Sequence, residues 1–223
     1  MTATVATAGT RSISLGTWVI VVLLPVGPAA IAVLRLLLPY YTATDASDMV
    51  AAVQAHPGRQ SAVLWLGYVG ILTLVPGLLA ATRVCRDAAP RLTAWALALA
   101  VPGYLSLGML LGTDHLLWGA NEAGLPTADR VGMAEAGHPS IDVALAVFVV
   151  GHVVGTVLLG LALRQSGRIP AWAAWAVTIS QPLHFVATVV LGSPQVDFVA
   201  WMLTAVGMAM VARELLKVPS TSR

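Results

Sequence analysis

Two aspartates and two histidines lie inside or at the ends of stretches of the sequence that are largely apolar. Asp114 and Asp197 lie near the ends of two such stretches, and His152 and His184 lie inside two others. A carboxylic acid that an apolar site keeps protonated can donate its proton, and a neighbouring imidazole can orient or relay that proton. These residue types favour acid–base chemistry on a lipophilic molecule, and all four are candidate catalytic residues.

Aromatic and amide side chains recur at helical spacing around these four residues, and we predict that they bind the substrate. They are Trp65 and Tyr68, Tyr104 and Trp118 on either side of Asp114, Gln181 and Phe185 around His184, and Trp201 one turn after Asp197. This periodicity puts each set on one face of a helix. A polar group that faced lipid would cost several kcal/mol. The faces, with both histidines, are therefore predicted to turn inward and to line one cavity.

Each of these side chains also has a simpler explanation. Asp114 and Asp197, at predicted helix ends, would be solvated or would cap the helix. Each histidine would make a single hydrogen bond between helices. The tryptophans near the ends of the apolar stretches, including Trp201, would anchor the chain at the membrane interface. Arg35, close to the outer end of its stretch, would reach that interface by snorkelling.

The elements that must position these residues are six apolar runs. Each run has about the length that an α-helix needs to cross a hydrocarbon layer of roughly 30 Å. The runs are Leu15–Leu38, Ser61–Val84, Leu92–Thr113, Ile141–Leu163, Ala171–Leu191 and Val196–Arg213. Hydrophobic residues make up 58% of the chain and charged residues 10%, far below the roughly 25% charged residues of soluble domains. The sequence predicts an all-α integral membrane bundle of six transmembrane helices.

The charges between the runs alternate from one side of the membrane to the other. One side has nine of the twelve basic residues: Arg11, Arg83, Arg86, Arg91, Arg164, Arg168, Arg213, Lys217 and Arg223. The other side has eight of the ten acids: Asp45, Asp48, Asp114, Glu122, Asp129, Glu135, Asp142 and Asp197. An excess of Lys and Arg marks cytoplasmic loops. Both termini are therefore predicted to be cytoplasmic, in a multi-pass protein of the cell membrane.

This topology divides the chain into three parts. Residues 1–14 and 217–223 are predicted cytoplasmic tails, and residues 15–216 form a single transmembrane domain. The outer loops, 39–60 and 114–140, are predicted to cover the outer end of the bundle as caps.

Each outer loop contains the pattern of a short amphipathic helix. The two helices are predicted to start near Ser47 and Thr127 and to stop before His56-Pro57 and His138-Pro139. Similar residues precede and follow both helices, which suggests a parallel internal duplication of helical hairpins. The patterns Gly108–Gly112 and Gly151–Gly155 are of the GxxxG type, which lets helices approach closely in lipid.

Several function classes find no support in the sequence. Most of the arginines lie in the loops between the apolar runs and form no basic stripe, so nucleic acid is not a predicted partner. Cys85 is the only cysteine, which excludes a disulfide within the chain. No phosphate-binding loop, HExxH or CxxC motif occurs, and neither a metal nor another cofactor is predicted. Paired histidines on two helices can ligate a b-haem, so His152 and His184 keep a haem protein as an alternative.

Acids on separate membrane helices, aromatic-rich interiors and the lack of a cofactor motif resemble the small integral-membrane terpene cyclases. These include the indole- and diketopiperazine-terpene cyclases and the meroterpenoid cyclases. The similarity concerns size and helix arrangement over the whole chain, and it is carried by Asp114, Asp197 and the aromatics around them. It implies cofactor-independent, proton-initiated cyclisation of a prenylated lipophilic substrate that enters from the bilayer. Asp114, with His115 beside it, is the acid we expect to be essential.

The main alternative to an enzyme is a small transporter linked to protons or cations, or a membrane protein that binds a ligand. In these readings the same acids and histidines would relay protons or hold a cation. The predicted partners are membrane lipids and a lipophilic small molecule from the bilayer. The sequence does not specify an oligomeric state.

Overall fold

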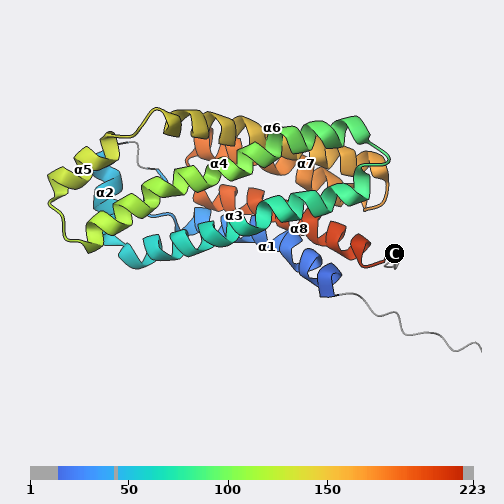
Figure 1. Cartoon of the computed structure of the whole chain (residues 1–223), viewed down its shortest axis with the longest axis horizontal. Coiled ribbons are helices and arrows are strands. Elements are labelled where there is room, and N and C mark those ends of the chain that lie inside the picture. The colour runs from blue at the N-terminus through green and yellow to red at the C-terminus, as the bar shows by residue number, and fades with distance from the viewer. Residues whose placement is uncertain (1–14, 43–44, 218–223) are drawn as a thin grey trace, which may run out of the picture.

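The computed structural model describes residues 15–42 and 45–217, and every regular element within them is helical (Figure 1). The predicted tail of residues 1–14 and nearly all of the tail 217–223 lie outside the described residues. The elements are α1 (Leu15–Leu37), α2 (Ala46–Ala55), α3 (Pro57–Cys85), α4 (Pro90–Glu122), α5 (Thr127–Glu135), α6 (Ser140–Ser166), α7 (Ala171–Val186), the π-helical turn η1 (Ala187–Leu191) and α8 (Pro194–Leu215). Six of these, with α7 and η1 as one span, are long and apolar enough to cross a membrane. The predicted all-α membrane bundle of six spans is confirmed, and the chain is a multi-pass membrane protein.

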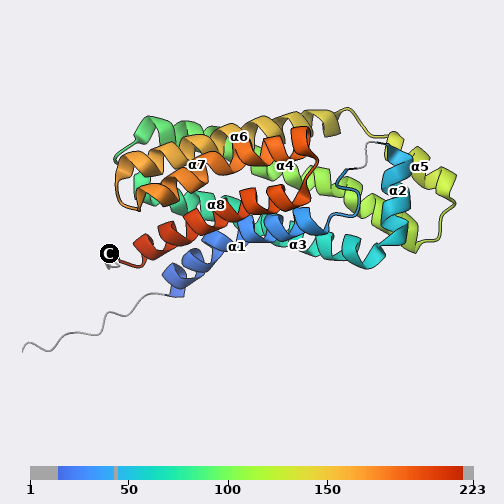
Figure 2. The same ribbon diagram turned by 180° about the vertical axis from the view of Figure 1, so that it is seen from behind.

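The six long helices form a closed ring. Contacts run from α1 to α3, from α3 to α4, from α4 to α6, and then through α7 and α8 back to α1. The front and back views show the two sides of this ring, with α3, α4 and α6 on one side and α1, α7 and α8 on the other (Figures 1 and 2). Side chains from all six helices can therefore meet at the centre of the ring.

Small residues bring α4 and α6 into close contact. A Cβ atom on Gly103 would lie 2.6 Å from the backbone nitrogen of His152, and one on Gly155 would lie 2.6 Å from the backbone nitrogen of Ala100. Such a stripe of small residues replaces the hydrophobic effect as the basis of packing between membrane helices. The predicted pattern Gly151–Gly155 thus lies at a helix interface. By contrast, a Cβ on Gly112 would meet nothing within 4 Å.

The two short helices α2 and α5 lie together beyond one end of the ring (Figure 1). Helix α4 has 33 residues, about 50 Å at 1.5 Å per residue, and so extends past a 30 Å hydrocarbon layer. Its extension packs against α2 through an apolar cluster of Val50, Val53 and Leu117. The buried Arg130 of α5 donates to the side-chain oxygens of Gln54 and Asn121. Short helices are thus present in both expected loops, while residues 114–122, expected to belong to the second loop, continue α4.

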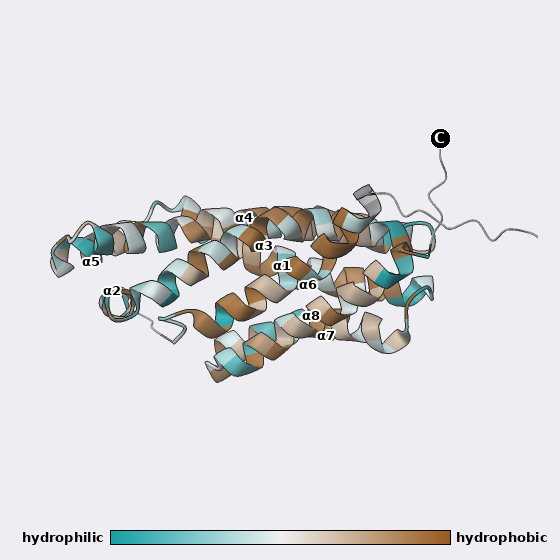
Figure 3. Ribbon diagram, turned by 90° about the horizontal axis from the view of Figure 1, so that it is seen from below, coloured by the Kyte–Doolittle hydropathy of each residue, from teal (hydrophilic) through white to brown (hydrophobic). Residues whose placement is uncertain are grey.

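The other end of the ring is the basic end. It comprises the turn between α3 and α4, the turn between α6 and α7, and the end of α8. These segments contain Arg83, Arg86, Arg91, Arg164, Arg168, Arg213 and Lys217. Hydrophilic residues gather at the two ends and apolar ones between them (Figure 3). The internal duplication stays a prediction.

Candidate functional site

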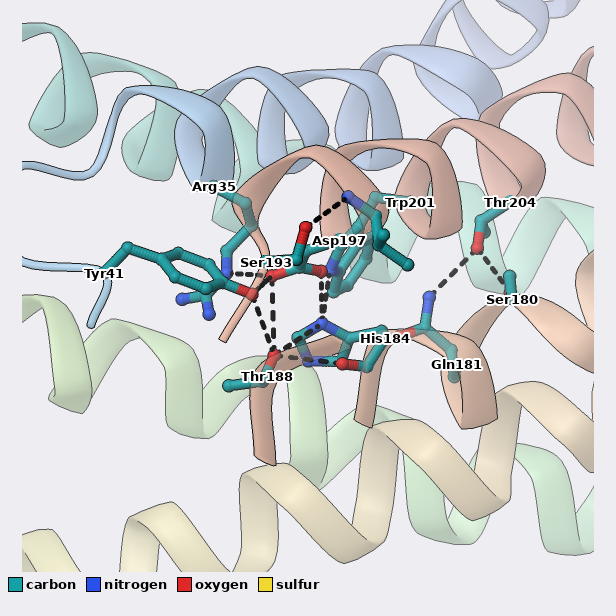
Figure 4. Close-up of polar contacts among 11 residues, drawn as sticks. Arg35, Tyr41, Ser180, Gln181, His184, Thr188, Ser193, Asp197, Trp201 and Thr204 are labelled. Carbon is teal, nitrogen blue, oxygen red and sulfur yellow. Dashed lines mark hydrogen bonds and ion pairs between the residues drawn. The ribbon is translucent and has the colours of Figure 1, made fainter. Parts of the chain in front are cut away.

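Asp197 is the centre of a polar cluster that joins α1, α7 and α8 (Figure 4). It lies in the first turn of α8, where the partial positive charge of a helix N-terminus stabilises a carboxylate. Its side chain is fully buried, and Nε of Arg35 donates to its Oδ2 at 2.6 Å. The hydroxyl of Tyr41 donates to the same oxygen at 2.8 Å. Asp197 is therefore an ion-paired carboxylate and not a solvated or capping one.

His184 holds the other oxygen of Asp197. Its Nδ1 lies 2.5 Å from Oδ1 of Asp197, and because a carboxylate only accepts, the proton of this hydrogen bond is on Nδ1. Nε2 has no hydrogen-bond partner among the described residues. The indole of Trp201 lies against this ring, with Nε1 at 3.3 Å from Nδ1. Trp201 is fully buried, so the interpretation of this tryptophan as an interface anchor is wrong.

Arg35 does not snorkel to the membrane interface as expected. Its side chain is 20% exposed and turns toward the fully buried Asp197, and its guanidinium lies over the ring of Tyr41 at 4.6 Å from the ring centre. A buried carboxylate on α8 offers a partner that is stronger than water at the interface, which explains the inward turn. Burial raises the pKa of the Tyr41 phenol, so Tyr41 remains a hydrogen-bond donor near neutral pH.

Asp114 has a different environment from Asp197. The hydroxyl of Tyr40 and Nε2 of Gln60, at 2.8 Å, both donate to its Oδ1. Burial, and after it the charge of Asp114, raises the pKa of the Tyr40 phenol far above its usual range. Tyr40 is therefore a donor in this pair. Oδ2 of Asp114 has no partner among the described residues, and no basic side chain pairs with this carboxyl group.

The two carboxylate clusters adjoin one cavity of about 380 Å³ at the end of the ring that α2 covers. Asp114, Arg35 and His184 line it directly, as do Tyr40 and Met49 from the covering segment. Most of the remaining wall is apolar: Ile31, Leu34, Leu38, Val63, Leu107, Leu110, Leu111, Leu145, Phe148, Val149 and Trp201. An apolar pocket with a few convergent polar groups is the usual form of a small-molecule site. We take this cavity as the candidate functional site.

His152 lies behind the cavity wall. It is 1% exposed and His184 is 8% exposed, so the prediction that both histidines face the interior is confirmed. Nδ1 of His152 contacts the carbonyl oxygen of Phe148, and Nε2 is buried without a partner. The ring stacks between the ring of Phe148, 4.1 Å away between centres, and that of Trp201, 5.9 Å away.

This packing does not fit a b-haem held between the two histidines. The ring centres of His152 and His184 lie only 5.3 Å apart, at an angle of 56°. A haem between two imidazole ligands would need the rings to face each other across an open slot, and here aromatic rings flank His152 on both sides. A metal site also lacks ligands, because no three His, Cys, Asp or Glu side chains gather within residues 15–42 and 45–217.

Two predicted substrate-binding residues are buried away from the cavity. Gln181 donates from Nε2 to Oγ1 of Thr204 at 3.0 Å (Figure 4), and its Oε1 is buried without a partner. Tyr104 shares a hydrogen bond of 2.8 Å with Thr156 of α6. Both residues turn inward as expected, but they join helices α7 to α8 and α4 to α6 rather than lining the cavity.

Four other predicted residues lie at the surface of the bundle. Trp65 is 70% exposed and Tyr68 is 54% exposed, so the expectation that they turn inward is wrong. With Trp118 they line an open groove of about 460 Å³ between α3 and α4. Phe185 is 42% exposed and lies outside the inward face of α7. On α3 the aromatic side chains lie on the lipid-facing side, because the inward face of this helix has the small residues that close packing needs.

Sequence reasoning missed three residues that shape the site: Gln60, Tyr40 and Tyr41. Gln60 is fully buried on the true inward face of α3, which continues through Val63 and Gly67. A buried amide at helical spacing from small residues was the signal that could have found this face. The two tyrosines follow α1 directly, and nothing local in the sequence indicates that each would bind a different carboxylate.

Comparisons with known proteins add no family to this description. The chain matches no family model, no curated protein and no solved structure.

Proposed function

We propose that this protein is a membrane-embedded enzyme that binds a lipophilic small molecule and protonates it from Asp114. The observation that supports this proposal is the free Oδ2 of Asp114, on the wall of an apolar cavity. A general acid must present its proton to the substrate, and Asp114 is the carboxyl group of the site that has an oxygen left to do so. Asp197 has partners on both oxygens and no oxygen to spare.

The reaction class that fits is a cofactor-independent cyclisation of the terpene cyclase type. The proton on Oδ2 adds to an alkene or epoxide of the substrate, and a second double bond of the same molecule attacks the cation and closes a ring. Loss of a proton to the Asp114 carboxylate ends the reaction. The product is an isomer of the substrate, so no oxidant, reductant or metal is consumed.

Neighbouring side chains would stabilise both the Asp114 carboxylate and the carbocation of the substrate. Tyr40 and Gln60 donate to Oδ1 of Asp114 and would stabilise the carboxylate that remains after proton transfer. The rings of Phe148 and Trp201 line the same cavity, and aromatic faces attract a cation. Exclusion of water by the apolar wall would protect the cation from capture.

The charge distribution supports a position in the cell membrane with both termini in the cytoplasm. The basic end of the ring would face the cytoplasm, and the end with α2 and α5 would face outward. The cavity would then lie in the outer half of the membrane, where a prenylated substrate can enter from the bilayer.

Replacing Asp114 with asparagine tests the proposal. The amide keeps the shape and both hydrogen bonds of the carboxyl group but has no transferable acid proton, so turnover should fall about 10²-fold or more. The full chain would be incubated with prenylated candidate substrates in D₂O, and isomeric products that gain deuterium at carbon would be counted by mass spectrometry. Asp142→Asn, an exposed acid in the first turn of α6, is the matched control. Wild-type turnover in Asp114→Asn would refute Asp114 as the acid, and with it the proposed mechanism.

A second candidate function is transport linked to protons or cations. The buried cluster of Arg35, His184 and Asp197 favours it, because ionisable groups inside a membrane bundle often belong to ion pathways. The cluster also adjoins η1, and π-helical turns are frequent at functional sites. The two functions differ in their need for a gradient: a cyclase forms product in detergent, whereas a transporter needs closed vesicles and moves its substrate without changing it.

A further inference from the structure

Among the described residues, the guanidinium group of Arg35 has a hydrogen-bond partner on one of its three nitrogens. Nε donates to Asp197, and neither terminal nitrogen has a hydrogen-bond partner among the described residues. In Figure 4 the two terminal nitrogens lie on the side of the group that is turned away from Asp197. They are not among the buried unpartnered atoms of the protein. The side chain of Arg35 is 20% exposed, so the fork formed by its two terminal nitrogens is open to a ligand.

This fork lies on the wall of the candidate site. Arg35 lines the cavity together with Asp114 and His184, and the apolar wall is formed by residues of α4, α6 and their neighbours. The cavity wall thus includes a planar cation with two unpartnered terminal nitrogens, while most of the remaining wall is apolar and suited to a hydrocarbon chain. Two parallel N–H donors match the two oxygens of a carboxylate.

The size of the cavity limits the ligand further. Its volume of about 380 Å³ lies near the lower end of the roughly 300–1,000 Å³ typical of small-molecule sites. One chain of moderate length fits such a space, and a phospholipid with two long chains does not.

We infer that the cavity binds a single-chain lipophile that ends in a carboxylate, with the terminal nitrogens of Arg35 on the two carboxylate oxygens. This inference rests on the proposed function, since it names the substrate class of the same site. The ion pair with Asp197 orients the guanidinium, and the headgroup fixed at Arg35 would place the hydrocarbon chain past Oδ2 of Asp114. In the substrate, the carboxylate would be the part that stays unchanged while the chain is cyclised.

A competition assay tests the headgroup directly. The full chain in lipid nanodiscs binds radiolabelled dodecanoate, which is displaced by unlabelled dodecanoate, dodecanol or dodecyl phosphate. Wild type should bind dodecanoate at least about tenfold more tightly than dodecanol, because charge-assisted hydrogen bonds are the stronger ones. Equal affinities for the acid and the alcohol would overturn the inference. Tightest binding of dodecyl phosphate would also overturn it, in favour of a phosphate headgroup.

Two variants separate this inference from general effects on folding. Arg35→Lys keeps a positive charge beside Asp197 but has no planar fork, so the preference for dodecanoate over dodecanol should fall at least about fivefold. Arg59→Lys makes the same change at an exposed arginine outside the cavity and should leave the preference intact. An unchanged preference in Arg35→Lys, measured on folded protein, would overturn the inference.

The binding assay also distinguishes failure of carboxylate recognition by Arg35 from failure of proton transfer by Asp114. Asp114→Asn should bind dodecanoate within about threefold of wild type, because the acid acts on the chain and not on the headgroup. Loss of turnover with retained carboxylate binding supports both proposals. Retained turnover in Asp114→Asn with an Arg35-dependent carboxylate preference would remove the proposed acid and leave the ligand class standing.

Discussion

Replacing Asp197 with asparagine should destabilise the protein strongly, because Asp197 is the counterion of a buried arginine. The substitution conserves shape and keeps one acceptor oxygen. It removes the charge that Arg35 faces at 2.6 Å and the acceptor that His184 faces at 2.5 Å. The substitution tests whether the Asp197 carboxylate holds α1, α7 and α8 together.

The expected loss in the free energy of unfolding depends on how deeply Asp197 and Arg35 are buried. Removing one partner of a buried ion pair costs roughly 3–5 kcal/mol, because the remaining charge loses its counterion in a medium of low dielectric constant. Asp197 is fully buried, but the side chain of Arg35 is 20% exposed, so water relieves part of this penalty. We therefore expect a loss of about 3 kcal/mol in the free energy of unfolding, the lower end of that range.

A double-mutant cycle separates the ion pair from other effects of the substitution. Reversible unfolding in mixed micelles would be measured for Asp197→Asn, Arg35→Gln and the double variant. The double variant has no unpaired charge, so it should be more stable than the sum of the two single losses implies, with a coupling of about 2 kcal/mol. Asp142→Asn, an exposed acid in the corresponding first turn of α6, should change stability by less than about 0.5 kcal/mol.

Two results would refute this reasoning. If Asp197→Asn unfolds like Asp142→Asn, the carboxylate is not the counterion of Arg35. If the single losses simply add in the double variant, Arg35 and Asp197 each contribute through other contacts.

The remaining predictions concern packing and topology. Gly155→Ala should cost roughly 1–3 kcal/mol in the same unfolding assay, because the new Cβ would lie 2.6 Å from the backbone of Ala100. Gly112→Ala, where a Cβ meets nothing within 4 Å, should stay within about 0.5 kcal/mol of wild type, and equal losses in both variants would contradict the close contact of α4 with α6. Reporter fusions after Arg223 and within Glu122–Glu135 should report opposite compartments, with the C-terminal fusion in the cytoplasm. The same compartment for both fusions would rule out six spans.

Hydropathy alone was enough to find the helices. A run of about twenty apolar residues has few ways to satisfy its backbone in lipid other than an α-helix, so the six spans follow from local composition. The two short helices also follow from local signals, since each is amphipathic and ends before a His-Pro pair, α2 at Ala55 and α5 at Glu135. The inward position of His152 and His184 could be predicted for a similar reason, because an imidazole facing hydrocarbon has no partner.

The inward face of α3 could not be found in the same way. In a membrane bundle both the lipid and the interior are apolar, so the periodicity that orients a helix in a soluble protein is weak. The aromatic spacing predicts that Trp65 and Tyr68 face inward, whereas the buried face is that of Gln60 and Gly67. Space for close packing, rather than polarity, decided the orientation.

The sequence by itself determined the membrane class, the six spans, the charge asymmetry and the presence of acids and histidines within apolar helices. Only the tertiary structure decided which acid has a charged partner. Arg35 and Asp197 are separated by 162 residues, and the closure of α8 against α1 brings them together. Asp114, on α4, is held by Tyr40 and Gln60 through one oxygen and lines the cavity. The physical reason is that a side chain's hydrogen-bond partners are set by which helices become neighbours, and helix order in a ring is a property of the packed bundle rather than of any local segment.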